Sequence, residues 1–403
     1  MIKFLVIAQD LRVSGTSEGL VSRSFISKLR NAYDESIIDV VYLKFHSSED
    51  QLQLLPINSI KEEVINYSVP FYIKWTNKLY YRLYHESLNE RYIQKKYTSH
   101  IASMDYAMYD HVFIRSAGLD YEAVLGVKNL PLLKKTIINF HDPFPVYWCA
   151  GNSSKLDNLE LFKLKKMQRV VSQSKKCVTP ARTLTNDMNM LYGGINKFHT
   201  LPHQYDQAVF DFSDRTYCFK KNKQITICYH GAIQFGRNIC SLLDAYNELL
   251  KDDAWYQEHT EFVVRVKNTT DINYLSSRYS SSKNIIVMGP ANFSESAYEQ
   301  TELADINIIL ENGPVYSNIL VGKAPFLAST GKPILSISPI RSELRDIIKN
   351  EKYIADCNDK EDIKEKLENL IKETKDSKDS VYPFGDYFSD KNFKKMLDAI
   401  LRK

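Results

Sequence analysis

Residues 321–335 read VGKAPFLASTGKPIL, the pattern of a short helix between two apolar strands. The helix opens at the pair Gly322-Lys323 and ends at Gly331, and it lies between the apolar segments 305–310 and 333–337. The first N–H groups of a helix lack backbone partners and carry the positive end of its dipole, so they attract anions. We therefore expect this helix start to bind a diphosphate, with Lys323 adding a full positive charge. The alternative is that Lys323 is a solvated surface residue.

The composition predicts a two-domain protein that does not bind nucleic acid. The chain has 403 residues, of which 44% are hydrophobic and 25% are charged, enough to build a large core divided between two domains. Its net charge of +4 is mild, and acids are interspersed among the basic residues, which argues against nucleic acid as a partner. The six cysteines lack metal-ligand spacing, so we expect free thiols and a cytoplasmic location. The apolar run at residues 1–8 is too short for a signal peptide or a membrane span, and no later segment is long and apolar enough to cross a bilayer.

Short apolar strands alternate with amphipathic helical segments in both halves of the chain. This alternation is typical of parallel sheets covered by helices on both faces. The predicted strands are residues 2–8, 37–45, 111–115, 136–140, 176–179, 225–229, 261–266, 284–288, 305–310 and 333–337. The predicted helices include residues 18–30, 181–192, 238–250, 294–303 and 341–350.

These segments predict an α/β protein with two doubly wound, Rossmann-like domains that face a central cleft. The polar, charge-mixed segment 206–223 separates the halves, so the domains are predicted as residues 1–205 and 206–388. In such sheets, ligands bind outside the carboxyl ends of the strands. Residues 389–403 form an amphipathic helix that we expect to dock on a domain surface, the N-terminal domain being one candidate.

The order of these pieces resembles the GT-B glycosyltransferases, specifically the family-4 type that builds bacterial surface polysaccharides. Arg237 stands where that family has a basic residue that grips the donor diphosphate. Gly322-Lys323 resembles the family's later Ser-Lys pair, and His141-Asp142 resembles its strand-end histidine that faces the donor sugar. The resemblance covers nearly the whole chain at the level of motifs. It implies a GT-B fold, with His141 and Asp142 as the catalytic candidates.

The resemblance also implies the reaction. The donor is expected to be a nucleotide-diphosphate sugar, UDP-linked, and the acceptor a glycan or a polyprenyl-linked molecule, with retention of configuration. Arg237 and Lys323 would stabilise the charge that develops on the diphosphate leaving group. The sequence contains no Asp-x-Asp motif, so we expect no metal and no cofactor.

Further residues are candidates for the walls of the cleft. Gly15 can let the backbone approach the donor diphosphate, and Ser14, Ser17 and Arg115 are predicted on the acceptor side. The alternatives are an ordinary strand-to-helix turn capped by Ser17 and a structural salt bridge at Arg115. A metal site at the spaced pair His199 and His203 is rejected because Pro202 breaks a helix there. Contacts to the donor sugar or nucleoside are predicted at Gly289, Pro290, Tyr316, Ser317 and Asn318.

Two positions depart from the family and keep three functions open. Phe326 and Asn318 stand where family-4 members usually carry glutamates, the first of which holds the donor ribose. The leading function is the sugar transferase. The second is a GT-B-shaped nucleotide-sugar isomerase or epimerase, with Asp142, His141 or Glu311 as its base. The third is a binding subunit that has lost catalysis, which the phenylalanine at position 326 suggests.

Residues 71–97 interleave aromatic and basic side chains. Aromatic rings beside cations suit a membrane interface, and an enzyme with a lipid-linked acceptor would need one, so peripheral contact with the inner face of the membrane is one prediction. The alternative is a helix pair packed on the first sheet, with half-buried tyrosines and solvated lysines. The residues concerned are Tyr72, Trp75, Tyr80, Tyr81, Tyr84, Tyr92 and Tyr97, with Lys74, Lys78, Arg82, Arg91, Lys95 and Lys96.

Overall fold

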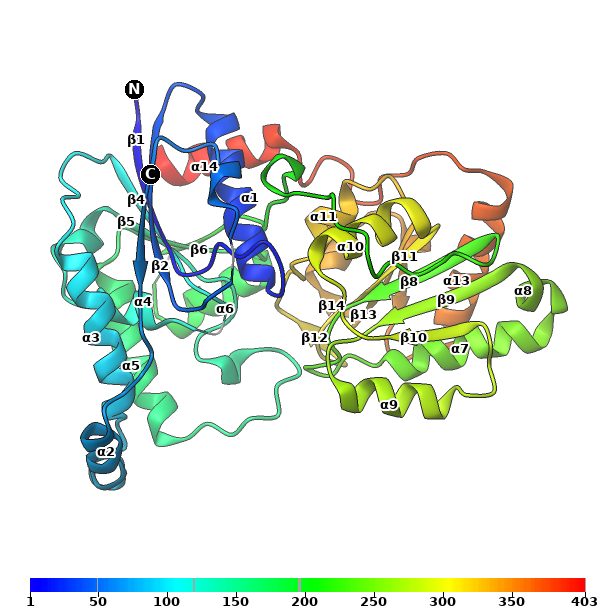
Figure 1. The fold of residues 1–403 in the computed structure, drawn as a ribbon, viewed down its shortest axis with the longest axis horizontal. Helices are drawn as coiled ribbons and strands as arrows, with labels where there is room; N and C mark the ends of the chain where they lie inside the picture. The colour runs from blue at the N-terminus through cyan, green and yellow to red at the C-terminus, as the bar shows by residue number, and fades with distance from the viewer. Residues whose placement is uncertain (49, 119, 195–196, 403) are drawn as a thin grey trace. The chain divides into compact units, whose positions relative to one another are not determined.

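The computed structural model describes residues 1–48, 50–118, 120–194 and 197–402, which form two compact units (Figure 1). Unit 1 consists of Met1–Cys149, Ser153–Val209 and Ser389–Lys403. Unit 2 consists of Ala150–Asn152 and Phe210–Phe388. The main division therefore falls after Val209 rather than after residue 205. The assignment of Ala150–Asn152 to unit 2 has no counterpart in the sequence prediction.

Unit 1 is built on a seven-stranded parallel sheet with the order β3-β2-β1-β4-β5-β6-β7. Its central strands are buried on both faces, which explains their continuous apolar runs. The strands are β1 (Lys3–Ala8), β2 (Ile37–Lys44), β3 (Ser59–Val64), β4 (His111–Arg115), β5 (Thr136–Asn139), β6 (Lys176–Thr179) and β7 (Phe198–Thr200).

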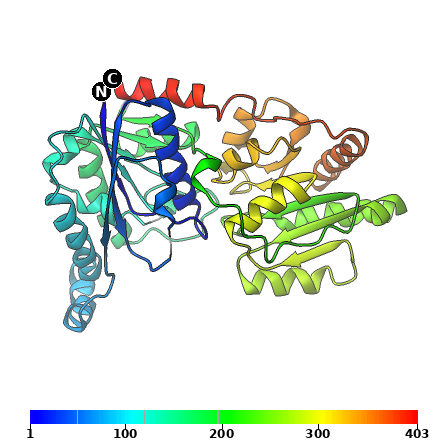
Figure 2. The same ribbon diagram turned by 45° about the horizontal axis from the view of Figure 1, so that its top comes forward.

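Helices cover both faces of this sheet. Figures 1 and 2 show α1 and the C-terminal α14 on one side of the strands and α3 on the other. The apolar side of α14 is buried at Phe393, Leu397 and Ile400, so this helix completes unit 1 by packing on α1. The helices are α1 (Ser17–Ala32), α2 (Phe71–Tyr84), α3 (Leu88–Ala102), α4 (Glu122–Gly126), α5 (Asn158–Gln173), α6 (Arg182–Leu191) and α14 (Asp390–Arg402), with short turns η1 (Leu52–Leu54), η2 (Pro131–Lys135) and η3 (Val146–Trp148).

Unit 2 repeats the architecture with a six-stranded parallel sheet of order β10-β9-β8-β11-β13-β15. A separate two-stranded parallel pair, β12 with β14, lies beyond β11 in the chain. The strands are β8 (Ile225–His230), β9 (Thr260–Arg265), β10 (Ile285–Met288), β11 (Ile306–Leu310), β12 (Tyr316–Ser317), β13 (Ile334–Ser338), β14 (Arg341–Ser342) and β15 (Ile354–Asp356).

The helices of unit 2 lie on both faces of its sheet. Figure 1 shows α7 and α9 on one side of the strands and α10 and α11 on the other. The helices are α7 (Ile239–Asp252), α8 (Ala254–His259), α9 (Thr269–Arg278), α10 (Phe293–Tyr298), α11 (Ala324–Ala328), α12 (Glu343–Ile347) and α13 (Lys360–Asp376). Shorter turns are η4 (Gln207–Val209), which belongs to unit 1, and η5 (Glu299–Leu303) and η6 (Glu351–Tyr353) of unit 2.

All ten predicted strands are present, and the differences have local causes. The sequence analysis missed β3, β7, β12, β14 and β15, because β3 is an exposed edge strand without an apolar run and the other four have only two or three residues each. The predicted helix 341–350 begins instead with β14, since Arg341 and Ser342 pair with β12. The predicted helix 294–303 changes at Glu299 into a π-helical turn, a local widening that often marks a functional or strained position.

Candidate functional site

In unit 2, two cations converge on the loop that follows β8. The Lys323 ammonium donates to the carbonyl of His230 and lies 4.4 Å from the ring centroid of Tyr229. The Arg237 guanidinium donates to the carbonyl of Ala232 at 3.0 Å and to Asn312 Oδ1 at 2.8 Å. The structure therefore brings together the two residues that the sequence placed at the donor diphosphate, although 86 positions separate them in the printed sequence.

The electrostatics around Lys323 favour an anion. Burial, and after it the positive charge of Arg237, lowers the pKa of its ammonium to about 7. The positive charges of Lys323 and Arg237 repel each other unless an anion binds between them. A diphosphate would relieve that repulsion and restore the protonated form of Lys323.

The start of α11 offers fewer backbone donors than the sequence predicted. Lys323 is the N-cap residue, and α11 has only five residues. The Ala324 N–H is bonded to the carbonyl of Val321 at 3.0 Å, and Pro325 has no N–H. The helix dipole therefore contributes less to anion binding here than the sequence predicted, and the side-chain charge of Lys323 contributes a larger share.

Glycine keeps the space beside Lys323 open. A Cβ atom at Gly231 would lie 3.0 Å from Lys323 Nζ and 2.9 Å from the hydroxyl oxygen of Tyr229. Gly236 has a φ of +79°, which other residues rarely adopt, and it turns the chain between β8 and Arg237. The two glycines thus let the backbone of the loop after β8 approach the Lys323 ammonium and let the chain turn toward Arg237.

The residues predicted at the donor sugar or nucleoside occupy two separate places. Gly289 and Pro290 follow the edge strand β10, and the Gly289 carbonyl accepts from Arg265 Nη1 at 3.0 Å. Tyr316 and Ser317 form β12, and the buried Asn318 follows them and accepts from the Ala150 N–H at 3.2 Å.

Phe326 occupies the position at which family-4 glycosyltransferases usually have a glutamate. Its side chain is buried, and its ring meets that of Phe293 at 5.7 Å between centroids, edge to face. Phe210 and Phe212 also contact Phe293, so this part of unit 2 is an aromatic cluster. A carboxylate contact to ribose, which the family glutamate implies, has no counterpart at this position.

Beneath the cation pair lies a buried ion pair that the sequence analysis did not identify. Glu299 is fully buried and accepts from Arg265 Nε at 2.6 Å, and His230 Nε2 lies 3.3 Å from the same carboxylate. Burial, and then the charges of Arg265 and Lys323, hold the pKa of His230 well below its usual range. The imidazole of His230 is therefore neutral at pH 7, while its backbone carbonyl accepts the hydrogen bond from Lys323.

Glu311, the alternative base for an isomerase, directly follows β11 and is buried. Burial raises the pKa of its carboxyl to about 7. A carboxyl with that pKa can exchange protons near neutral pH, which is the property that a general base needs.

In unit 1, His141 follows β5 and meets residues from the start of α1. Its Nε2 lies 3.5 Å from Ser17 Oγ and 3.7 Å from a carboxylate oxygen of Glu18. Its ring stacks on that of His203 at 4.3 Å between centroids. The structure places one ligand atom each of Glu18, His141 and Asp142 within 4.8 Å of one another, close enough for the three groups to hold a metal ion together. We call Ser17, Glu18, His141, Asp142 and His203 the His141 cluster.

His203 and Arg115 are buried in unit 1, where their side chains contact other residues of the protein. Burial holds the pKa of His203 well below its usual range, and the charges of His141 and Arg115 add to that effect. Arg115 is 3% exposed, donates from Nε to Ser22 Oγ at 3.0 Å, and packs its guanidinium 4.3 Å from the Phe25 ring. This geometry favours a structural role for Arg115 over contact with the acceptor.

The loop before α1 has the conformation that glycine permits. Gly15 has a φ of +86° and nothing within 4 Å of an added Cβ, so the backbone there is open to a ligand. Ser14 precedes it and is half-buried. The N-cap of α1 is Thr16 rather than Ser17, and its hydroxyl donates to Asp10 at 3.0 Å. Ser17 is thereby left exposed in the first turn of α1, toward His141.

Glu18 and His203 are the two members of the His141 cluster that the sequence analysis did not assign to a site. Glu18 lies in the first helical turn after β1, at the same edge of the sheet as the residue after β5, so strand order contains a signal for it. The only signal for His203 was its position just after β7, whose three residues the sequence analysis did not recognise as a strand.

Comparison with known proteins identifies the fold. No protein-family model matches the chain, and no curated protein matches it by sequence. Among solved structures, the α,α-trehalose 6-phosphate synthase of Burkholderia multivorans has a TM-score of 0.64 at 8% identity, over 100% of this chain and 98% of that chain. The lipopolysaccharide outer core galactosyltransferase WaaB has a TM-score of 0.58 at 12% identity, over 100% and 99%.

A third structure extends the comparison beyond transferases. The UDP-GlcNAc 2-epimerase of Neisseria meningitidis, bound to UDP-GlcNAc, has a TM-score of 0.56 at 15% identity, with 100% of both chains covered. These identities show a shared fold. The chain therefore has the GT-B architecture of two Rossmann-like parallel-sheet domains, as the sequence analysis predicted.

Proposed function

We propose that this protein is a glycosyltransferase of the family-4 type that uses a nucleotide-diphosphate sugar, UDP-linked, as its donor. The observation that carries the proposal is the convergence of Lys323 and Arg237 on the loop after β8. Breaking the sugar–phosphate bond leaves negative charge on the diphosphate, and two preorganised cations stabilise that charge in the transition state without a metal. The structural neighbour from Neisseria meningitidis binds UDP-GlcNAc and a neighbour from Anabaena binds UDP and glucose, which supports the donor class.

The His141 cluster of unit 1 supplies the acid–base chemistry in this proposal. An acceptor hydroxyl loses its proton as it attacks the sugar carbon, and Glu18, His141 and Asp142 offer an imidazole and two carboxylates to receive it. The acceptor is a glycan or a polyprenyl-linked molecule in cell-surface polysaccharide synthesis. Retention of configuration, which the family resemblance implies, requires that the hydroxyl attack from the face that the diphosphate leaves.

Nucleotide binding tests the donor site. We expect one nucleoside diphosphate to raise the melting temperature of the wild type, since saturation at 100 times Kd stabilises by about 2.7 kcal/mol. The Lys323→Ala, Arg237→Ala variant should lose that shift. A matched variant, Lys220→Ala, Lys251→Ala, removes two exposed cations of unit 2 away from this loop and should keep it. The same shift in wild type and Lys323→Ala, Arg237→Ala would refute the site.

A second candidate is a nucleotide-sugar isomerase or epimerase. It is favoured by Glu311, whose pKa of about 7 suits a general base, and by the acid–base groups of the His141 cluster. Product analysis separates the two enzymes. Incubation with a nucleotide sugar alone gives a changed sugar only for the isomerase, whereas transfer requires an acceptor. If the protein binds the nucleotide but gives neither product, it is the catalytically inactive binding subunit that the replacement of the family glutamate by Phe326 suggests.

A further inference from the structure

Helix α2 carries an apolar stripe that the described residues leave uncovered. Phe71, Trp75, Leu79 and Leu83 recur every four residues, so they follow one another along one side of the helix. Their side chains are 81, 66, 63 and 62% exposed. Large apolar side chains gathered on one exposed face mark a surface that binds something else.

The opposite side of α2 holds the helix to unit 1. The Asn77 side-chain oxygen accepts from the Leu88 N–H at 2.6 Å, and the Tyr80 hydroxyl accepts from Arg91 Nη1 at 3.0 Å. These contacts join α2 to the beginning of α3. The alternative that both helices pack on the sheet therefore holds for α3, whose Tyr97 is buried. It does not hold for α2, none of whose residues is buried.

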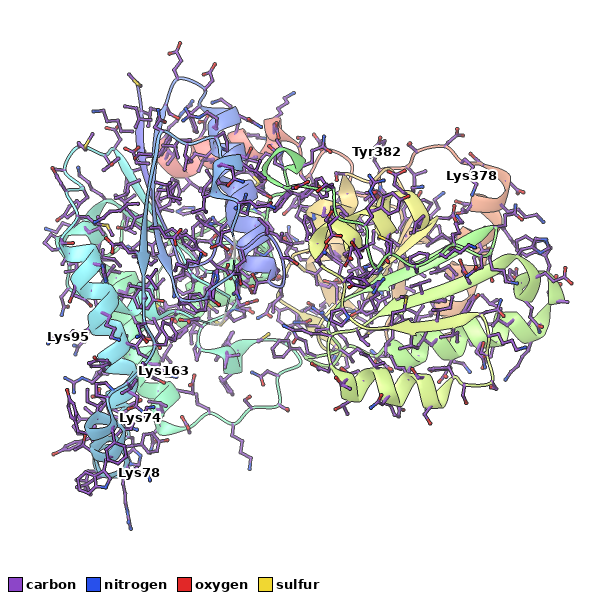
Figure 3. The ribbon with its side chains drawn as sticks, viewed as in Figure 1. Lys74, Lys78, Lys95, Lys163, Lys378 and Tyr382 are labelled. Atoms are coloured by element: carbon purple, nitrogen blue, oxygen red, sulfur yellow. The ribbon has the colours of Figure 1, made fainter. Side chains whose placement is uncertain are left out.

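A stripe of cations runs beside the apolar stripe. Lys74, Lys78 and Arg82 also recur every four residues, and all three are exposed. The sequence of α2 contains no aspartate or glutamate, and in the described part of the chain these three cations form no ion pair. Figure 3 shows Lys74 and Lys78 on α2, which forms the tip of unit 1.

The apolar stripe continues into an open groove of about 500 Å³ beside the start of α3. Trp75, Leu79, Leu83 and Leu88 contribute to its lining. The surface of this groove is mainly apolar, so it suits hydrocarbon better than a polar ligand, which would lose hydrogen bonds on leaving water.

We propose that α2 docks unit 1 on an anionic lipid bilayer. The helix lies in the plane of the interface, with its four stripe residues among the acyl chains next to the headgroups and Lys74, Lys78 and Arg82 at the level of the lipid phosphates. Long basic side chains can reach the phosphates while their methylene stems stay beside the apolar stripe. A second copy of the chain fits this face less well, since a two-fold contact would set the same three cations against themselves.

Vesicle flotation of the full chain without nucleotide tests the docking surface. We expect binding to vesicles of phosphatidylcholine mixed with phosphatidylglycerol, and binding at least about tenfold weaker to phosphatidylcholine alone. Trp75→Ser, Leu79→Ser should weaken binding to the anionic vesicles at least about tenfold, and Lys74→Gln, Lys78→Gln, Arg82→Gln should do the same. All these side chains are exposed, so unchanged melting curves are expected and are measured in parallel.

A matched control removes three other exposed cations. Lys220→Gln, Lys251→Gln, Lys395→Gln has the same net charge as the variant of the cation stripe and should bind as the wild type does. The proposal is overturned if both triple variants lose binding equally, which is a general charge effect, or if the wild type does not bind anionic vesicles. Self-association of the wild type that Trp75→Ser, Leu79→Ser abolishes would assign the face to a second copy instead. Because no nucleotide is present, failure here leaves the donor site of unit 2 untouched.

Discussion

Lys323 and Arg237 donate hydrogen bonds to two backbone carbonyls that lie two residues apart, those of His230 at the end of β8 and of Ala232 in the loop that follows. Backbone carbonyls fix the positions of both cations without neutralising them, as a carboxylate would. The two side chains are thus held in place before an anion arrives, and such preorganisation is a condition for electrostatic stabilisation of a leaving group.

The pKa of Lys323 predicts how donor binding depends on pH. The free protein has a pKa of about 7 at this ammonium, and a bound diphosphate raises it, so binding takes up a proton above pH 7. The Kd for a nucleotide sugar, whose diphosphate has no titrating proton near neutrality, should therefore rise by up to about tenfold per pH unit above pH 7. Calorimetry in buffers of different ionisation enthalpy measures both the Kd and the proton.

Lys323→Arg is the control for that experiment. A guanidinium stays protonated over the whole range, so the variant should bind with a Kd that hardly changes with pH. A wild-type Kd that stays constant from neutral to alkaline pH would contradict the assignment of Lys323 to the diphosphate.

Substitutions at His141 should separate catalysis from donor binding. His141→Gln removes the acid–base group from the His141 cluster, and we expect kcat to fall by about 100-fold or more, with unchanged nucleotide-induced stabilisation. His203→Phe keeps a ring in the stack with His141 and should retain most of the activity. Full activity of His141→Gln would remove His141 from the mechanism, and lost nucleotide binding would make its role structural.

Glu122 should make unit 1 less stable as the pH rises. Burial raises the pKa of this carboxyl to about 8, and the negative charge of Asp120 adds to that effect. The native state then holds a proton that the unfolded chain loses at about pH 4.3, so the free energy of unfolding falls between those two values by at most about 1.4 kcal/mol per pH unit.

Glu122→Gln removes this titration. In denaturant melts, the free energy of unfolding of the variant should gain on that of the wild type as the pH is raised from about 4.5 to 8, and not beyond. A difference between the two proteins that is independent of pH would show that Glu122 ionises normally.

Gly151 is the tight point of the segment Ala150–Asn152 in unit 2. Its φ is +77°, and an added Cβ would lie 1.9 Å from the carbonyl oxygen of Phe235. Gly151→Ala must therefore displace the segment or strain it, at a cost on the order of 1–3 kcal/mol. Proteolysis should cut the variant faster at this segment. Gly193→Ala, also at a positive φ but in open space, is the control for backbone strain alone.

Local patterns were sufficient for the sheets and for part of the donor site. Strands that are buried on both faces must be apolar throughout, so strands such as β1 and β11 could be recognised from their sequence. Lys323 was predicted from the pattern of a helix start and Arg237 from the family resemblance, and the neighbouring parallel strands β8 and β11 present their carboxyl ends at one edge. Edge strands have no such requirement, and β3 was missed for that reason.

Contacts between distant residues were decided only by the tertiary structure. Ser17 and His141 lie 124 positions apart, and no periodicity links them or brings His203 beneath the imidazole. Phe326 could be read as a missing glutamate, but its burial against Phe293 depends on how α10 and α11 pack. The interleaved aromatic and basic residues of α2 left membrane contact and core packing both open. Periodicity records which residues share a face, and only packing decides whether that face meets the core or stays exposed.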